Sequence, residues 1–173
     1  MDAGEIARLS GREIRVSAGV EIEQLLDRYE RPLYAYLLTL LGDPDTARDC
    51  TQDAFLRALE QLRRGKEING GWLYTVGRNR AIDHLRDRRR VGPEDVTLEM
   101  DLEAGQGEPF HLTAVRRILD RLSPDDREAL YLFSVDGFRT DEIAAMLGIQ
   151  PGALRVRLSR ARQRFRALYE EES

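Results

Sequence analysis

Residues 72–90 read WLYTVGRNRAIDHLRDRRR, a stretch that joins an apolar stripe to a strongly basic one. Apolar and small residues recur in it at helical spacing: Leu73, Val76, Gly77, Ala81 and Leu85. This spacing predicts a helix with one packed side. The stretch also holds six arginines against two acidic residues, with Trp72 and Tyr74 at its front. Such a helix suits nucleic acid, because guanidinium groups hold phosphates and aromatic rings stack on exposed bases. A surface helix with a solvated basic face explains the same composition.

The formal net charge is −4, but the charges are segregated along the chain. Residues 21–60 hold nine acidic and four basic residues, and residues 91–115 hold six acidic residues and no basic one. Residues 143–169 hold six arginines and no acidic residue. Lys66 is the only lysine, so the basic residues are almost all arginines, whose planar fork pairs with phosphate and guanine edges. The two basic blocks therefore indicate contact with nucleic acid more clearly than the overall charge does.

Cysteine and histidine are scarce. Cys50 is the only cysteine, so the chain forms no internal disulfide and no cysteine cluster for zinc. His84 and His111 are the only histidines, and neither has a partner at metal-ligand spacing. We therefore expect no metal and no other cofactor. No apolar run reaches the length of a membrane span, and the N-terminus lacks a signal-peptide core, which predicts a cytoplasmic protein.

An enzyme, for example a nuclease, is a weak hypothesis. The pairs that could carry acid–base chemistry are Asp83 with His84 and Asp125 with Asp126. Neighbouring residues on a helix point in different directions, so neither pair converges on one substrate. The sequence therefore predicts a binding protein and not an enzyme.

The spacing of apolar residues predicts an all-α fold of two small helical domains. Residues 1–19 alternate polar, basic and small residues without a stable period. We interpret them as a mobile N-terminal arm with room for one turn of helix around residues 6–9. Residues 21–41 repeat apolar residues every three or four positions and end at Gly42, which predicts a helix. Pro32 lies inside this run, so we expect a kink or a break there.

The second predicted helix begins at Asp43 and Pro44, a capping carboxylate followed by a first-turn proline. It is expected to run to Arg64, with Gly65 past its end. Its outward side carries an acidic stripe: Asp45, Asp49, Gln52 and Asp53. Solvation and dipole matching explain the stripe, and so does docking of a basic partner helix. The glycine-rich loop at residues 66–71 is either a connector or a place where a flipped base is caught.

Residues 92–110 are rich in glycine, proline and acidic residues, which predicts a flexible acidic linker. It separates a first domain at residues 20–91 from a second at residues 111–173. A flexible anionic segment can occupy a basic channel, although an ordinary solvated linker is the more frequent case.

The second domain contains a short helix, a tight turn and an arginine-rich helix. Ser123 is expected to cap an earlier helix, and Thr140 to cap the short one at residues 141–147. Gly148 ends that helix, and the next one, residues 151–169, follows after only a few residues. This is the layout of a helix-turn-helix. Because its arginines lie outside an apolar stripe, we infer that the second helix enters a major groove and reaches guanine edges or phosphates.

With both basic elements in place, the chain resembles a bacterial RNA polymerase sigma factor of the extracytoplasmic-function (ECF) class, in the sigma-70 family. The resemblance is carried by DPDTARDCTQDAFLRAL (43–59), WLYTVGRNRAIDHLR (72–86), LSPDDREALYLFSVDGF (122–138) and TDEIAAMLGIQPGALRVRLSRARQRFR (140–166). It implies an alternative sigma factor that binds core polymerase, recognises −35 and −10 promoter elements and melts DNA. Residues 20–91 would be sigma domain 2, and residues 111–173 sigma domain 4. The alternative is a helix-turn-helix regulator that binds duplex DNA without polymerase.

The resemblance also implies which residues make each contact. Docking on the β′ clamp helices of polymerase is expected from Asp45, Asp49, Gln52, Asp53 and Arg57. The −10 element is expected to be bound and melted by Trp72, Tyr74, Arg78, Asn79, Arg80, Asp83 and Arg86. The −35 element is expected to be read by Arg155, Val156, Arg157, Ser159, Arg160 and Arg162. The other implied partners are the β flap of polymerase and an anti-sigma factor, and the linker is expected to follow the RNA exit path.

Gly77, Gln150, Cys50 and Thr51 depart from the family pattern, and the first two have a predicted effect. Gly77 stands where alanine is common and costs about 1 kcal/mol in helix propensity. Gln150 stands where a capping serine or threonine is usual, so the recognition helix is expected to begin with a weaker cap.

Overall fold

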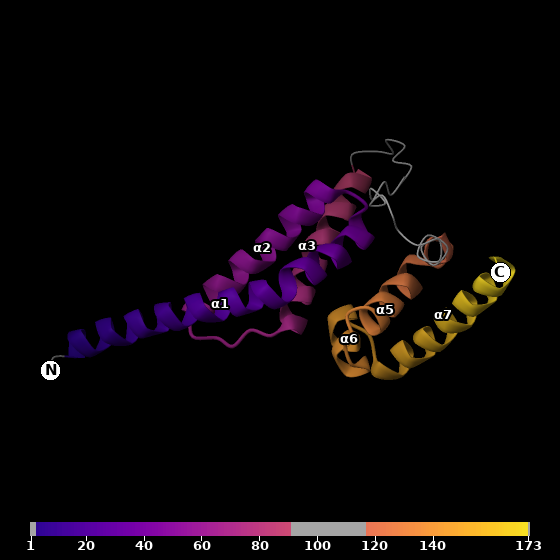
Figure 1. Cartoon of the computed structure of the whole chain (residues 1–173). Coiled ribbons are helices and arrows are strands. Elements are labelled where there is room, and N and C mark those ends of the chain that lie inside the picture. The colour runs from indigo at the N-terminus through magenta and orange to yellow at the C-terminus, as the bar shows by residue number, and fades with distance from the viewer. Residues whose placement is uncertain (1–2, 91–116, 173) are drawn as a thin grey trace. The chain divides into compact units, whose positions relative to one another are not determined.

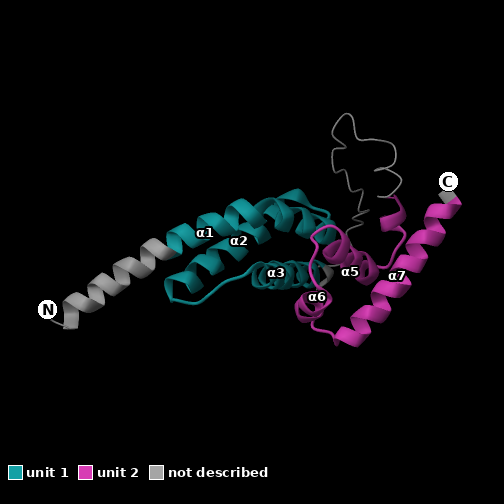
Figure 2. Ribbon diagram, turned by 60° about the horizontal axis from the view of Figure 1, so that its bottom comes forward, with its two compact units in different colours: residues 1–94 teal, residues 95–173 magenta. Residues whose placement is uncertain are grey.

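The computed structural model describes residues 3–90 and 117–172, and side chains over residues 18–88 and 117–171. Every element assigned in these ranges is a helix, which confirms the expected all-α fold. The chain divides into two compact units, residues 1–94 and residues 95–173 (Figure 2), whose helices are labelled in Figure 1. Within the described ranges, no helix combines the length and the apolar character needed to cross a membrane. The expected linker at residues 92–110 lies outside the described residues.

Unit 1 packs α1 (Ala3–Leu41), α2 (Pro44–Arg63) and α3 (Gly70–Arg90) into a bundle in which each helix contacts the other two. The apolar stripes seen in the sequence meet at its centre. The largest side chains of this core are Leu33, Tyr36, Leu37, Leu41, Phe55, Leu62, Leu73 and Tyr74. Burial of these stripes removes apolar surface from water and is the main source of stability for the bundle.

The first helix differs from the expectation in two respects. It begins at Ala3, so the segment interpreted as a mobile arm is helical and continuous with the helix expected from residue 21. Pro32 lies inside α1, and the helix continues through it without the break that the sequence allowed. Proline there removes one backbone hydrogen bond, while the neighbouring Leu33 is fully buried in the core. Packing against α2 and α3 therefore outweighs the local preference for a break.

Both interhelical connections in unit 1 are closed by side-chain caps. The carboxylate of Asp43 accepts hydrogen bonds from the backbone N–H of Thr46, at 2.8 Å, and from its hydroxyl. These bonds hold the pKa of Asp43 below its ordinary value, and they confirm the predicted start of α2. Gly65 follows the end of α2 with φ of 75°, a conformation that favours glycine. The N–H of Trp72 donates to Oδ1 of Asn69 at 2.9 Å, so α3 begins within the glycine-rich loop.

Two glycines let α3 approach α1 closely. A β-carbon on Gly70 would lie 2.5 Å from the ring of Tyr29, so that ring would have to shift to admit it. A β-carbon on Gly77 would lie 3.2 Å from Leu37 and 3.3 Å from Leu33. Gly77 therefore lowers the helix propensity of α3, but its missing side chain lets α3 pack closely on α1.

Unit 2 contains a helical turn at residues 117–120, followed by α5 (Pro124–Ser134), α6 (Thr140–Leu147) and α7 (Pro151–Glu172). Helix α7 packs on both α5 and α6. The residues buried between them are Ile118, Leu122, Ala129, Leu130, Leu132, Ile143, Ala144, Met146, Leu147, Leu154, Leu158 and Ala161. Ser123 caps α5 as predicted, because its hydroxyl accepts from the N–H of Asp126 at 3.2 Å.

The tight turn between α6 and α7 depends on Gly148, whose φ of 65° and ψ of 32° are left-handed. The N–H of Ile149 donates to the carbonyl of Ala144 at 3.0 Å and closes the turn. The prediction that Thr140 caps α6 is wrong, because Thr140 is the first helical residue. The carboxylate of Glu142 instead accepts from the N–H of Arg139 at 2.8 Å. Helices α6 and α7 form the expected helix-turn-helix.

Candidate polymerase and nucleic-acid interfaces

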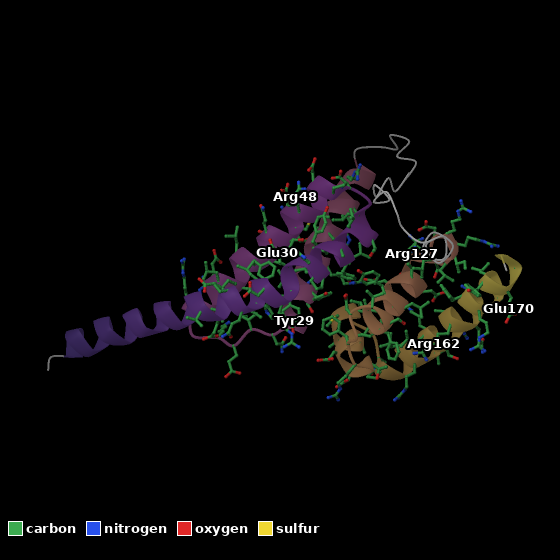
Figure 3. The ribbon with its side chains drawn as sticks, viewed as in Figure 1. Tyr29, Glu30, Arg48, Arg127, Arg162 and Glu170 are labelled. Carbon is green, nitrogen blue, oxygen red and sulfur yellow. The ribbon has the colours of Figure 1, made fainter. Side chains whose placement is uncertain are left out.

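The acidic stripe predicted on α2 lies on the surface of unit 1. Asp45, Asp49 and Gln52 are exposed, whereas Asp53 is partly buried. Asp45 pairs with Arg48, the α2 side chain labelled in Figure 3, at 2.9 Å on the outside of the helix. This exposed pair adds little to stability, so the stripe is available as a docking surface.

An exposed leucine in the stripe was missed by the sequence analysis. Leu56 has 62% of its surface exposed, although large apolar side chains are usually covered. It follows Gln52 by four positions and Asp53 by three, so it shares their face of α2. That spacing was the signal that could have found it. The stripe thus combines carboxylates with an apolar contact point.

Asp53 connects the stripe to the basic helix. Its Oδ2 atom lies 3.2 Å from Nε of Arg57 on α2 and 3.6 Å from Nε of Arg80 on α3. The three side chains are 34%, 54% and 54% exposed. A residue predicted to bind polymerase therefore contacts a residue predicted to bind DNA.

A hollow of about 300 Å³ opens between α2 and α3 at this point. It is lined by Thr46, Asp49, Cys50, Gln52, Asp53, Leu56, Arg80 and His84. Cys50 is 3% exposed, and its burial raises the pKa of the thiol above the ordinary value. The hollow brings acidic, apolar and basic side chains together at one opening.

Tyr74 is not the exposed aromatic that the sequence suggested. It is 1% exposed, and its ring centroid lies 5.1 Å from that of Tyr36 on α1. The expectation that unstacked bases meet Tyr74 is therefore wrong, because its ring is part of the core. Trp72, two positions earlier and on another side of α3, is partly exposed and remains accessible.

The other predicted −10 residues lie on the outer side of α3. Asn79, Arg80, Asp83 and Arg86 are exposed, and Arg78 is partly exposed. Asp83 and Arg86 pair at 3.8 Å on the same helix. Most of these polar groups are therefore exposed along α3.

The six predicted −35 residues fall into two groups on α7. Arg155, Val156, Ser159 and Arg160 are exposed on its outward face. Arg157 and Arg162 lie at the two edges of its buried face and contact α5. Arg157 lies 3.3 Å from a carboxylate oxygen of Asp125, and the guanidinium of Arg162 lies 4.5 Å from the ring centroid of Phe133. Arg157 and Arg162 therefore engage α5, while the other four are exposed.

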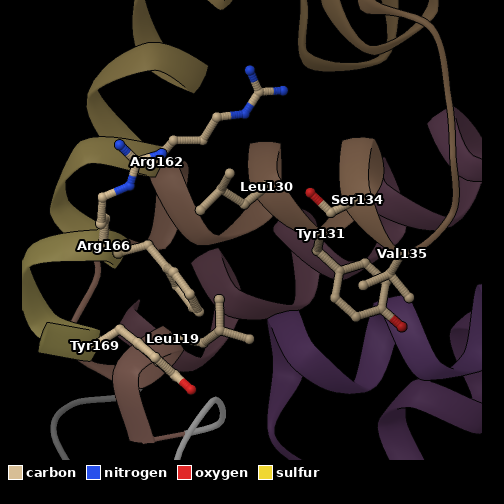
Figure 4. Close-up of a pocket in the computed structure, with 9 residues that line it drawn as sticks. Leu119, Leu130, Tyr131, Ser134, Val135, Arg162, Arg166 and Tyr169 are labelled. Carbon is tan, nitrogen blue, oxygen red and sulfur yellow. The ribbon is translucent and has the colours of Figure 1, made fainter. Parts of the chain in front are cut away.

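A second hollow, of about 490 Å³, opens between α5 and α7. Figure 4 shows its walls, with Leu130, Tyr131, Ser134 and Val135 on one side and Arg162, Arg166 and Tyr169 on the other. Its walls are mainly apolar, and Val135 and Tyr169 are 63% and 47% exposed. Burial raises the pKa of Tyr131 to about 12, so its hydroxyl is neutral. This apolar groove was not predicted from the sequence.

In the ranges that the structure describes, no group of three or more histidine, cysteine, aspartate and glutamate residues converges on one point. The carboxylates near α3 and α5 face arginines instead.

Two protein families describe these two units. The sigma-70 region 2 family matches residues 25–91, and the sigma-70 region 4 family matches residues 112–165. The ECF RNA polymerase sigma factor EcfG of Rhodopseudomonas palustris is 34% identical over 142 residues, which cover 79% of this chain and 78% of the relative. The chain belongs to the ECF sigma factors. The sigma factor CarQ of Myxococcus xanthus is 31% identical to it over 157 residues, covering 86% and 89% of the two chains.

Solved structures of sigma factors share the fold. The sigma factor RpoE of Bartonella quintana, solved in complex with the anti-sigma factor NepR, superposes with a TM-score of 0.67 at 28% identity. The match covers 87% of this ECF sigma factor and 97% of the other chain. CnrH, solved with the cytosolic domain of CnrY, has a TM-score of 0.66 at 23% identity and supports the fold alone.

Proposed function

We propose that this ECF sigma factor is an alternative sigma factor that binds core RNA polymerase and directs promoter-specific initiation. The observation that carries the proposal is the outward face of α7, where Arg155, Val156, Ser159 and Arg160 are exposed beside the tight turn of a helix-turn-helix. Side chains on such a helix reach base edges in the major groove. Because the chain belongs to the ECF sigma factors, that contact corresponds to a −35 element.

Unit 1 supplies the other contacts. The stripe on α2, with Leu56 added, is proposed to dock on the β′ clamp helices. The exposed side of α3 is proposed to hold the −10 strand through phosphate contacts, while Trp72 and the loop at residues 66–69 trap unstacked bases. Trapping a base offsets an unstacking cost of a few kcal/mol. The function is binding without a catalytic step, and its affinity should fall with salt.

The apolar groove between α5 and α7 is proposed to receive an apolar element of the polymerase β flap. Its size and mainly apolar walls, with Val135 and Tyr169 exposed, support this role. The relative from Bartonella quintana was solved with an anti-sigma factor. By similarity, we propose that this sigma factor is also held by an inhibitor until it is needed. A protein that acts with RNA polymerase on chromosomal promoters is proposed to work in the cytoplasm.

Transcription from a promoter library with purified core polymerase tests the proposal. We expect RNA from a subset of templates only when the sigma factor is added. The selected templates should share two conserved elements at a fixed spacing. If no template gives RNA that depends on the sigma factor, the proposed function is wrong. If the protein binds duplex DNA as tightly without polymerase as with it, a polymerase-independent regulator is favoured instead.

A further inference from the structure

We propose that Asp53 is a positioning residue that holds Arg80 against α2 in the free protein and releases it when polymerase docks. The inference rests on the proposed function, because it connects the surface assigned to polymerase with the surface assigned to DNA. It starts from one contact, the carboxylate of Asp53 on α2 and the guanidinium of Arg80 on α3, which lie 3.6 Å apart.

The contact is electrostatic and geometrically poor. Oδ2 of Asp53 is buried and accepts no hydrogen bond within the described residues, although two guanidinium groups lie within 4 Å of it. A buried acceptor without a hydrogen bond gains free energy when a well-aligned donor reaches it. A better-placed donor would therefore compete with both Arg57 and Arg80 for Asp53, and Arg80 is the more distant of the two.

The hollow between α2 and α3 gives such a donor a route. Asp49, Gln52, Asp53 and Leu56 line it together with Arg80. A side chain of polymerase that enters the hollow meets Asp53 and Arg80 at the same time. If it donates to Asp53, it competes with Arg80, whose guanidinium is then free to contact a DNA phosphate.

If polymerase displaces Arg80 from Asp53, the affinity for polymerase depends on the charge of Arg80. An ion pair that only stabilises the fold would not have this effect. If polymerase binding releases Arg80, then removing the charge of Arg80 removes a competitor for Asp53 and tightens polymerase binding, because coupling between sites is reciprocal. Partly exposed ion pairs of this kind contribute about 0.2–1 kcal/mol, which corresponds to an affinity change of about 1.4- to fivefold. A substitution in the DNA-facing helix should therefore improve a protein–protein affinity.

The experiment measures the affinity of the full chain for core RNA polymerase by fluorescence anisotropy. Arg80→Gln is expected to bind core polymerase about two- to fivefold more tightly than the wild-type chain. Arg80→Lys keeps the charge and should restore an affinity close to that of the wild type. The charge-matched control is Arg31→Gln, an exposed arginine of α1 that no prediction assigns to either partner. It should leave the affinity unchanged.

A second set of variants tests the role of Asp53 itself. In an Asp53→Asn background, Arg80→Gln should have no further effect on polymerase affinity, because the competition has already been removed. The inference is overturned if Arg80→Gln leaves the affinity unchanged or weakens it, or if its effect persists in the Asp53→Asn background. Failure of the wild-type chain to bind core polymerase would overturn the proposed function itself. Normal wild-type binding with no effect of Arg80→Gln overturns the inference alone.

Discussion

The guanidinium of Arg164 on α7 lies 3.1 Å from Oδ2 of Asp126 on α5, and only 12% of the Asp126 side chain is exposed. The same aspartate lies in the first turn of α5, where its N–H donates to the hydroxyl of Ser123. One residue therefore joins the cap of α5 to the middle of the recognition helix. This link and the pair between Arg157 and Asp125 fix the edge of α7 that does not face outward.

We expect Asp126→Asn to destabilise unit 2 by about 1–2 kcal/mol, because it weakens a charge-assisted hydrogen bond at a nearly buried acceptor. Asp125→Asn is the matched control, since it removes the same charge from the same helical turn. Its carboxylate is 68% exposed, so it should change stability by no more than about 0.5 kcal/mol. Urea unfolding of the full chain measures both. Equal effects of the two variants would contradict a special role for Asp126.

Because the outward face of α7 is assigned to DNA and not to polymerase, a substitution there should weaken promoter binding without weakening polymerase binding. Arg155→Ala should weaken binding of the holoenzyme to a selected promoter by about 1–3 kcal/mol, the range for loss of a good base contact. Its affinity for core polymerase should not change. The control Arg117→Ala removes an exposed arginine of unit 2 that lies outside α7. It should leave both promoter binding and polymerase affinity unchanged. An equal loss of core binding in Arg155→Ala would show that α7 does not have the assigned role.

Tyr74 and Trp72 should behave differently when truncated. Tyr74→Ala removes a fully buried ring that packs on Tyr36, and we expect it to cost about 3–5 kcal/mol in stability. Tyr74→Phe keeps the ring and should retain promoter opening. Trp72→Ala should reduce promoter opening, measured by 2-aminopurine fluorescence in the −10 strand, with a smaller loss of stability. Normal opening by Trp72→Ala would exclude this ring as the base trap.

Asp43 predicts an acid-dependent loss of stability in unit 1. Its hydrogen bonds with Thr46 lower its folded pKa below the ordinary 3.8. The stabilisation is therefore present above pH 3.8 and is lost as the pH falls through the lower, folded pKa. Asp43→Ala should cost about 1 kcal/mol at pH 7, and the difference from the wild type should shrink below pH 3.8. Asp43→Asn keeps a capping oxygen but does not titrate, so it should retain most of the stability at pH 7. A cost of Asp43→Ala that stays the same in acid would contradict this account.

Local features of the fold were predictable from the sequence, whereas contacts between helices were not. Asp43, Ser123 and Gly148 act within one turn of their own helix, so spacing alone identified them. The burial of Tyr74 depends on which side of α3 meets α1, a choice that the mixed composition of α3 left open. The pairing of Asp53 with Arg80 joins residues on different helices, so no sequence period predicts it.

The α7 arginines show the same limit within the candidate site. The resemblance implied six −35 positions, and all six lie outside the apolar stripe of α7. Arg157 and Arg162 lie at the edges of that stripe, where Asp125 and Phe133 of α5 reach them. The helical period alone does not indicate where the neighbouring helix ends and solvent begins. The apolar groove was missed for the same reason, because its walls come from α5 and α7 together.

The central claim is that two units of one chain contact a promoter at two places only when polymerase carries them. A DNase I footprint on a selected promoter, with the sigma factor alone, core polymerase alone and both together, tests it most directly. Both the −35 and −10 elements should be protected when the two proteins are present together, and neither element should be protected by one protein alone. Full protection by the sigma factor in the absence of polymerase would contradict it.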